Sequence, residues 1–266
     1  MMFREHPERG AYLKPTQEPE TTCFLIHHSG GSAASFSPLL SRLPGNWRSL
    51  AVELPGRGAS GERPACRSTA EMVERLAPAV LAQGAERIAV FGHSLGALVA
   101  YELVRELERR GEAPVWLGVS GSPAPQTVAR RAERRDLWSR ERLVAFLREL
   151  GGTPEEMFTI PDVVDYMVEV LRGDLHVVDT YDHTDGPLLR APISVYSGAA
   201  DPLAKAALLD GWRERTRGAV NTRTWPGGHF YLFEHVESFA ECLVADVRSV
   251  LYDAPEAARD EKGDEL

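Results

Sequence analysis

The sequence predicts an α/β protein, built on a twisted and mostly parallel sheet with helices on both faces. Short apolar segments alternate with helical patterns along most of the chain, and such alternation is typical of parallel strands joined by right-handed helical crossovers. The length of 266 residues fits one large domain, which buries roughly three-quarters of its extended surface on folding. We therefore expect a single domain over residues 1–266 that needs no disulfide or metal for stability.

The expected strands are short segments, most of them apolar, that end at or shortly before glycine, proline or serine. They cover residues 22–26, 49–54, 87–91, 114–120, 193–197 and 220–225. Helical patterns cover residues 69–83, 95–110, 203–217 and 236–251. The polar first 20 residues are expected to form an arm with one edge strand, and the charged residues 254–266 a disordered tail.

The alternation breaks between residues 123 and 186, where the sequence is helical in pattern and rich in charge. Apolar residues recur at helical spacing up to residue 150, the Gly-Gly-Thr-Pro string at 151–154 ends that pattern, and a second pattern starts at residue 162. A helical insertion in this position predicts a lid over a functional site. A plain helical layer of the fold is the alternative.

Composition argues against several classes of function. The net charge of −9 argues against nucleic-acid binding as the main task, and no apolar stretch approaches the roughly 20 residues of a membrane span. Cys23, Cys66 and Cys242 show no metal-ligand spacing and suggest a reducing compartment. Because the first residues also lack a signal-peptide pattern, we expect a cytoplasmic protein that uses no membrane, nucleic acid, metal or cofactor.

A Gly-x-Ser-x-Gly string at residues 92–96 follows one apolar run directly and opens the helical pattern at 95–110. In that position the two glycines allow a tight, strained turn that exposes the hydroxyl of Ser94. Amides of the first helical turn then point toward the chemistry. An ordinary glycine-rich turn with an incidental serine is the alternative, and the presence of partners for Ser94 decides between the two.

A serine hydroxyl needs a base to take its proton and an acid to orient that base. Asp201 follows the run at 193–197 and His229 follows the run at 220–225, so both are expected at the sheet edge that holds Ser94. The run at 114–120 ends in Gly-Ser-Pro with no carboxylate, which leaves Asp201 without an obvious rival. The pattern predicts Ser94 as nucleophile, His229 as base and Asp201 as the orienting acid.

Attack on a carbonyl also requires two N–H donors for the developing oxyanion. The amide of Leu95 should be one, and the glycine-containing loop at 27–31 should provide the other. From the residues alone we predict acyl transfer to water, and this prediction does not distinguish thioester from oxoester substrates. A carboxylesterase, an acyltransferase, and a catalytically silent module that binds an acyl carrier all stay open.

Six short strings, spread over roughly residues 22–250, carry a family resemblance. They are His-Ser-Gly-Gly-Ser at 28–32, Glu-Leu-Pro-Gly-Arg-Gly at 53–58, Phe-Gly-His-Ser-Leu-Gly-Ala at 91–97, Leu-Gly-Gly-Thr-Pro-Glu at 150–155, Leu-Arg-Gly-Asp at 171–174 and Gly-Gly-His-Phe at 227–230. Together they resemble the type II thioesterases, discrete α/β-hydrolases that accompany modular polyketide and nonribosomal-peptide synthases. The resemblance implies the α/β-hydrolase fold.

The resemblance also implies a reaction, namely hydrolysis of acyl thioesters from the phosphopantetheine arm of an acyl or peptidyl carrier protein. In the family this reaction often clears stalled or wrongly primed acyl groups. Matching positions give the catalytic roles to Ser94, His229 and Asp201, and the oxyanion amides to Leu95 and Ser29.

The oxyanion loop of this chain departs from the family at two positions. His27 stands where the family usually has proline, and Ser29 stands where a small residue such as alanine is usual. Because every residue except proline has a backbone N–H, the amide of Ser29 is still expected to donate.

Two further expectations concern the substrate and the partner. An apolar pocket discriminates weakly, because one buried methylene changes affinity only about fourfold, so we expect tolerance toward short and medium acyl groups. Carrier proteins are usually acidic, and a monomer of this acidic chain would need a local basic face to bind them. Arg130, Arg131, Arg134 and Arg135 are spaced to cluster on one helix, with a merely solvated charged surface as the alternative.

Overall fold

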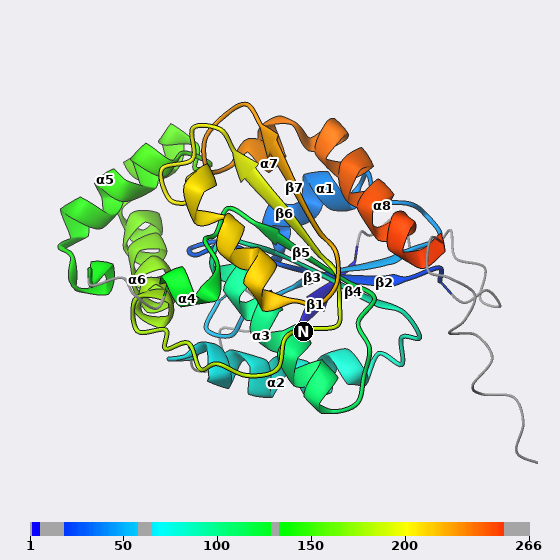
Figure 1. Ribbon diagram of the computed structural model, residues 1–266. Helices are drawn as coiled ribbons and strands as arrows, with labels where there is room; N and C mark the ends of the chain where they lie inside the picture. The colour runs from blue at the N-terminus through cyan, green and yellow to red at the C-terminus, as the bar shows by residue number, and fades with distance from the viewer. Residues whose placement is uncertain (1, 6–18, 58–64, 129–132, 253–266) are drawn as a thin grey trace, which may run out of the picture.

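The computed structural model describes residues 2–5, 19–57, 65–128 and 133–252 (Figure 1). Its centre is a seven-stranded sheet in the order β1-β3-β2-β4-β5-β6-β7, in which β1 is antiparallel to β3 and the other neighbours are parallel. The mostly parallel sheet confirms the predicted α/β class and the edge strand in the N-terminal arm. The predicted disordered tail lies outside the described residues.

The bounds of the elements follow the predicted pattern closely. The strands are β1 (Phe3–Arg4), β2 (Thr22–Ile26), β3 (Arg48–Val52), β4 (Ile88–His93), β5 (Trp116–Ser120), β6 (Ile193–Gly198) and β7 (Val220–Trp225). The α-helices are α1 (Ser37–Leu40), α2 (Thr69–Leu81), α3 (Leu95–Arg109), α4 (Pro125–Val128), α5 (Arg140–Leu150), α6 (Pro161–Asp179), α7 (Tyr231–Glu234) and α8 (Val236–Tyr252). Short 3-10 helices are η1 (Ala33–Phe36), η3 (Arg135–Leu137), η4 (Glu155–Thr159), η5 (Ala206–Leu208) and η6 (Asp210–Arg215). None of the described helices is both long and apolar enough to span a membrane.

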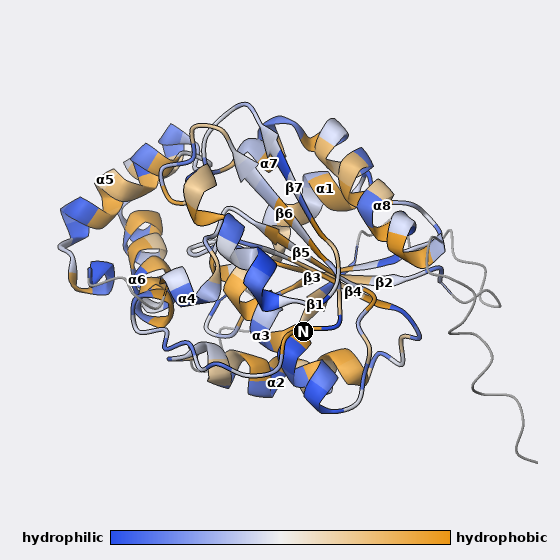
Figure 2. Ribbon diagram, viewed as in Figure 1, coloured by the Kyte–Doolittle hydropathy of each residue, from blue (hydrophilic) through white to orange (hydrophobic). Residues whose placement is uncertain are grey.

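The sheet separates two hydrophobic cores, because successive side chains of a strand point to opposite faces. On β2, Phe24 and Ile26 pack in the core with α2 and α3, whereas Cys23 and Leu25 pack in the core with α1 and α8. Figure 1 shows these helix pairs on opposite faces of the sheet. In Figure 2, α2 and α8 alternate between hydrophobic and hydrophilic turns, as expected for helices with one buried face.

One predicted helix is wrong. Residues 203–217 form the two short 3-10 helices η5 and η6 instead of a continuous α-helix. Gly211 is the second residue of η6, and its carbonyl accepts a hydrogen bond from Gln126 Nε2 at 3.0 Å. The indole of Trp212 is fully buried and donates to the carbonyl of Ser122 at 3.0 Å. These tertiary contacts, together with the low helix propensity of glycine, override the local periodicity.

The described residues of the helical insertion (123–128 and 133–186) lie beyond the carboxyl ends of the strands, on the side where α5 and α6 stand in Figure 1. Their two long helices pack on each other around a small core of their own. That core holds Leu143, Val164, Val168, Leu171 and Leu175. Helix α6 continues to Asp179, several residues beyond the pattern that predicted it.

The sheet also has a point where the direction of strand addition reverses. The chain places β3 on one side of β2 and then returns to place β4 on the other side. In open parallel sheets, ligands bind in the crevice that such a reversal leaves at the carboxyl ends of the strands. The loops that follow β2 and β4 are therefore the expected walls of a site, and they carry the predicted oxyanion loop and Ser94.

Candidate active site

Ser94 occupies a strained turn between β4 and α3. Its backbone has φ 57° and ψ −118°, and it is the only residue other than glycine with a positive φ among the described residues. A Cβ at Gly92 would lie 2.0 Å from the carbonyl oxygen of Gly96, and a Cβ at Gly96 would lie 2.0 Å from that of Ile26. Both flanking glycines are therefore required by close backbone approach, and strain of this kind collects at functional sites.

Asp201 and His229 lie in the loops that follow β6 and β7. His229 Nδ1 is 2.8 Å from Asp201 Oδ2, and both side chains are almost fully buried. The second carboxylate oxygen of Asp201 accepts the amide of Leu203 at 2.8 Å, so the carboxylate is fixed from two sides. A Cβ at Gly198 would lie 2.1 Å from the carbonyl oxygen of Gly228, and this close approach brings the two loops together.

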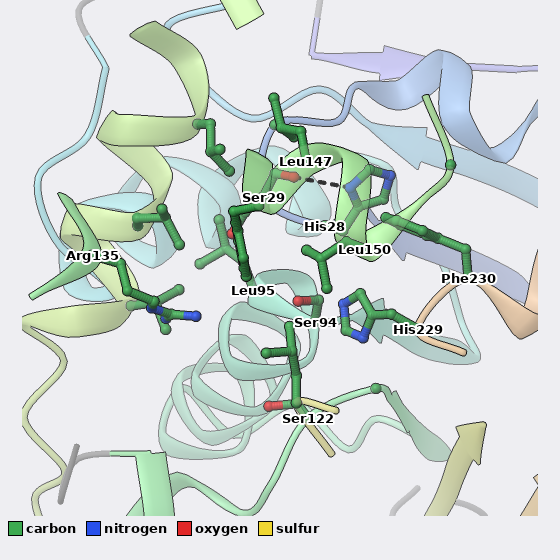
Figure 3. Close-up of a pocket in the computed structure, with 18 of the residues that line it drawn as sticks. His28, Ser29, Ser94, Leu95, Ser122, Arg135, Leu147, Leu150, His229 and Phe230 are labelled. Atoms are coloured by element: carbon green, nitrogen blue, oxygen red, sulfur yellow. Dashed lines mark hydrogen bonds between the residues drawn. The ribbon is translucent and has the colours of Figure 1, made fainter. Parts of the chain in front are cut away.

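Ser94 and His229 line one cavity, and Asp201 stands behind His229. Figure 3 shows the side chain of Ser94 beside the imidazole of His229. Among the described residues, Ser94 Oγ makes no hydrogen bond. Catalytic hydrogen bonds are often long in unliganded enzymes and shorten when substrate binds, so this arrangement is consistent with a nucleophile and its base.

The two predicted oxyanion donors line the same cavity. Leu95 is the first residue of α3, so its amide has no acceptor within the helix. Ser29 belongs to the loop after β2, which we call the oxyanion loop (residues 27–33). The next amide in this loop, that of Gly30, donates to Asp174 Oδ2 at 2.7 Å. The loop is therefore anchored one residue beyond the predicted donor.

A buried ion pair provides that anchor. Arg57 donates to both oxygens of Asp174, with Nη1 2.5 Å from Oδ2, and also to the carbonyl of Gly31 at 3.4 Å. The side chains of Arg57 and Asp174 are 4% and 2% exposed. Burial alone would lower the pKa of Arg57, but the adjacent Asp174 carboxylate outweighs it and raises that pKa. The pair thus joins the Pro-Gly-Arg loop, the oxyanion loop and α6 in one contact.

His27 ties the oxyanion loop to β3 from the other side. Its Nε2 accepts the amide of Leu54 at 3.3 Å, and its Nδ1 is 2.8 Å from the carbonyl of His28. These two bonds are satisfied together only by the neutral ring with the proton on Nδ1. Burial, with the charge of Arg57, holds the pKa of His27 well below its usual value. His27 therefore holds the oxyanion loop in place as a neutral side chain.

Two more histidines surround His229 and were not assigned roles from the sequence. The ring of His93 lies 4.8 Å from that of His229, and His93 Nδ1 is 2.9 Å from Ser120 Oγ. Burial and the proximity of His229 hold the pKa of His93 well below its usual range. Burial lowers the pKa of His28 to about 4. Both rings are uncharged at neutral pH, so they pack against the site without adding positive charge.

The cavity has a volume of about 180 Å³ and an apolar wall built mainly by the helical insertion. The apolar side chains on this wall are Val128, Phe146, Leu147, Leu150, Met167, Leu171, Leu175 and Val178. Leu98 of α3 and Leu203 add to it from the body of the fold. Ser122 and Arg135 are polar groups in the same lining, and no sequence pattern had pointed to either as part of a pocket.

The predicted cluster of docking arginines is not found in its expected form. Arg130 and Arg131 lie outside the described residues. Arg134 precedes the 3-10 helix η3 and pairs with Asp136, and Arg135 is 7% exposed. The expectation of an exposed helical face is therefore wrong for Arg135, because the buried carboxylate of Asp179 draws its guanidinium inward.

Within the described ranges, no group of three or more histidine, cysteine, aspartate or glutamate side chains could hold a metal ion. A histidine hydrogen-bonded to a buried carboxylate, beside a serine on a strained turn and a pair of amides, can carry out acyl transfer.

Comparisons with known proteins point to the same chemistry. The family model of the thioesterase domain matches residues 21–246. The chain is 33% identical over 220 residues to thioesterase PikA5 of Streptomyces venezuelae, covering 82% of this chain and 78% of that protein.

Solved structures add a likeness in three dimensions. The chain is similar to the type II thioesterase BorB from the borrelidin biosynthetic cluster, with a TM-score of 0.83 and 34% identity over 93% of this chain and 98% of that one. It is also similar to RedJ, a thioesterase of the prodiginine pathway in Streptomyces coelicolor, with a TM-score of 0.79 and 30% identity over 92% and 97%.

Proposed function

This chain belongs to the thioesterase domain family, and we propose that it hydrolyses acyl thioesters through Ser94, His229 and Asp201. The observation that supports these roles most strongly is the Asp201–His229 hydrogen bond, which orients an imidazole into the cavity that Ser94 also lines. That arrangement joins a base, its orienting acid and a nucleophile on a strained turn.

The proposed reaction runs in two steps through an acyl-enzyme. His229 takes the proton of Ser94 as Oγ attacks the thioester carbonyl, and the amides of Leu95 and Ser29 bind the resulting oxyanion. Collapse breaks the carbon–sulfur bond, and His229 returns the proton to the leaving thiolate. A water molecule then attacks the ester on Ser94 with His229 again as base, which releases a carboxylic acid and restores the serine hydroxyl.

Asp201 acts through His229 in this scheme. Its carboxylate accepts Nδ1–H, which leaves Nε2 free to accept the proton of Ser94 and stabilises the imidazolium that forms. The thiolate is an easier leaving group than an alkoxide, because a free thiol has a pKa of about 8.5.

The named relatives support a class of substrate. A protein of a borrelidin cluster and one of a prodiginine pathway are described as thioesterases of those pathways. We therefore propose that this enzyme acts on acyl groups carried by the phosphopantetheine arm of an acyl or peptidyl carrier protein, and that it clears stalled or wrongly primed groups. It would do so as a monomer in the cytoplasm, where its free cysteines stay reduced.

Matched substrates test this proposal against its alternatives. We expect wild-type enzyme to hydrolyse the N-acetylcysteamine thioester of a short acid far faster than the ethyl ester of the same acid. Equal or reversed rates would indicate a carboxylesterase, and transfer of the acyl group to an added alcohol in place of water would indicate an acyltransferase.

A fluorophosphonate probe tests the remaining alternative, a silent carrier-binding module. We expect the probe to label Ser94 in the wild type and to leave the Ser94→Ala variant unlabelled. Failure to label the wild type, in a preparation with a cooperative unfolding transition, would favour the binding module.

A further inference from the structure

The acyl cavity contains a charged side chain in an otherwise mostly apolar wall. Arg135 lines the cavity together with apolar residues such as Phe146, Leu147 and Val178, although it is only 7% exposed. Figure 3 shows its guanidinium pointing into the pocket from the side opposite His229, with Ser94 between them. An acyl chain attached to Ser94 would therefore enter a space that has this guanidinium on its far wall.

One edge of the Arg135 guanidinium is held by Asp179. Nε and Nη2 donate to Asp179 Oδ1 at 2.9 and 2.5 Å, and the backbone amide of Arg135 donates to Oδ2 at 2.6 Å. The side chain of Asp179 is fully buried. This fixes the orientation of the guanidinium plane. Within the described part of the chain, Nη1 has no acceptor, so its N–H groups remain available on the cavity side.

An acyl chain that fills the cavity displaces water from Nη1, and a charged donor that is then left without an acceptor is costly. The pocket is thus built to favour a ligand that supplies an oxygen at this place over one that supplies only methylene groups. We propose that Arg135 selects acyl groups carrying a neutral oxygen, a keto or hydroxyl group, on the acyl chain beyond the thioester carbonyl. This inference rests on the proposed function and names the substrate class of the same site.

The charge balance favours a neutral oxygen over a carboxylate. Asp179 already offsets the charge of Arg135 through a direct ion pair, so a second carboxylate would bring an excess negative charge into a buried, largely apolar cavity. A ketone or hydroxyl oxygen accepts the Nη1 hydrogen bond without that charge. Ser122, whose hydroxyl donates to the carbonyl of Pro123 at 3.1 Å, keeps lone pairs that could accept from a substrate hydroxyl.

The test compares thioesters of equal chain length. N-acetylcysteamine thioesters of hexanoic acid, 3-oxohexanoic acid, 5-oxohexanoic acid, their hydroxy counterparts and hexanedioic acid are hydrolysed by wild type, and kcat/KM is measured for each. We expect at least one keto or hydroxy thioester to exceed the hexanoyl thioester by roughly tenfold to a hundredfold, as a hydrogen bond from a charged group allows.

The variant is designed to fold. Because Arg135→Met alone would leave the carboxylate of Asp179 buried without a partner, the double variant Arg135→Met, Asp179→Asn removes both charges. We expect the double variant to hydrolyse the oxygenated thioester and the hexanoyl thioester with nearly equal kcat/KM. Arg172→Met is the matched control, because Arg172 donates to the carbonyl of Asp136 in the same insertion and is not part of the cavity lining. Its preference should equal that of wild type.

The outcomes separate this inference from the proposed function. If wild type hydrolyses none of the thioesters, the proposed function fails and this inference with it. If it hydrolyses all neutral thioesters at similar rates, or if the double variant keeps the wild-type preference, the inference fails while the proposed function stands. A preference for the hexanedioyl thioester over the neutral ones would also overturn the inference, since it would show recognition of a carboxylate.

Discussion

The carboxyl edge of the sheet and the helical insertion are built in different ways. At the sheet edge, Ser94 follows β4, which pairs with a strand on each side. The loop that carries His229 packs against the end of β6 so closely that Gly198 has no room for a Cβ. The insertion has a small core of its own, and exposed ion pairs such as Arg140–Asp165 lie on its surface. Reacting groups are thus placed on the most constrained backbone, which is where precise geometry is easiest to hold.

Contacts from the insertion reach the loops at the sheet edge. Asp174 of α6 binds Arg57 and the amide of Gly30. Leu171 lies 3.6 Å from the position that a Cβ of Gly30 would occupy. Phe230 packs closely against Gly152, because a Cβ at Gly152 would lie 2.6 Å from the Phe230 ring. The oxyanion loop therefore depends on α6, whereas α5 has an outer, exposed surface. The comparison suggests that chemistry fails when the edge is altered, and that selectivity and stability change when the insertion is altered.

The largest effect should come from Asp201→Asn at the sheet edge. The amide cannot hold His229 in the tautomer that accepts the proton of Ser94, so we expect kcat to fall about 10⁴-fold. Stability should change far less than activity. Steady-state kinetics on an acyl N-acetylcysteamine thioester, with a urea denaturation curve for each protein, measures both quantities. A loss in kcat of less than tenfold would show that Asp201 does not orient the base.

The next largest effect is expected at the Arg57–Asp174 ion pair, because this pair connects the two regions. Asp174→Leu leaves the guanidinium of Arg57 without its charge partner and should lower the free energy of unfolding by about 3 to 5 kcal/mol. It should also lower kcat by roughly tenfold to a hundredfold, since the oxyanion loop loses its anchor at Gly30.

The double variant Arg57→Met, Asp174→Leu separates the two effects. It removes both buried charges, so stability should recover much of the loss, while kcat should stay low because Gly30 still lacks its acceptor. If kcat recovers together with stability, the pair is only structural and does not position the oxyanion loop.

A smaller effect is expected from Leu143→Ala in the core of the insertion. Leu143 is fully buried between α5 and α6, and truncation of such a leucine lowers the free energy of unfolding by about 2 to 5 kcal/mol. Because the sheet edge is untouched, we expect KM to rise and kcat to change by less than about threefold. Leu208→Ala, at an exposed leucine, is the control and should leave both unchanged. A collapse of kcat in Leu143→Ala would contradict the division of roles between the two regions.

The pH dependence of stability should report on the sheet edge alone. The pKa values of the buried His27 and His93 are held well below 6.5 in the folded state, so below about pH 6.5 the unfolded chain binds protons that the folded chain does not. Their contribution to stability is present above that pH and is lost as the pH falls, by at most about 1.4 kcal/mol per pH unit for each histidine.

Urea denaturation at pH 7, 6 and 5 measures this slope. In the insertion, the pKa of Asp136 is lowered to about 2, chiefly by Arg134, so that carboxylate keeps its charge throughout the range. The His27→Gln variant should show a shallower slope than wild type. A wild-type stability that does not change between pH 7 and 5 would rule out this account of the buried histidines.

The sequence predicted the sheet edge better than the insertion, and the reason is physical. Ser94, Asp201 and His229 each follow a strand of the sheet, and parallel strands bring their ends together whatever the loops do. The burial of Arg135 depends on Asp179, which lies 44 residues further along the chain, and the contact between Arg57 and Asp174 spans 117 residues. Local spacing contains no information on such pairs, so it predicted an exposed arginine cluster and gave the Arg57–Asp174 pair no role.

The central claim is that Ser94 opens a carrier-bound thioester, and intact-mass analysis of an acyl-loaded carrier protein tests it directly. We predict that wild-type enzyme converts the acyl carrier to the free phosphopantetheine form, with loss of the acyl mass. Ser94→Ala should leave the carrier loaded at any practical enzyme concentration, because removal of the nucleophile lowers kcat about a million-fold. An acyl carrier that stays loaded with wild type, or that is released equally by Ser94→Ala, would contradict the account.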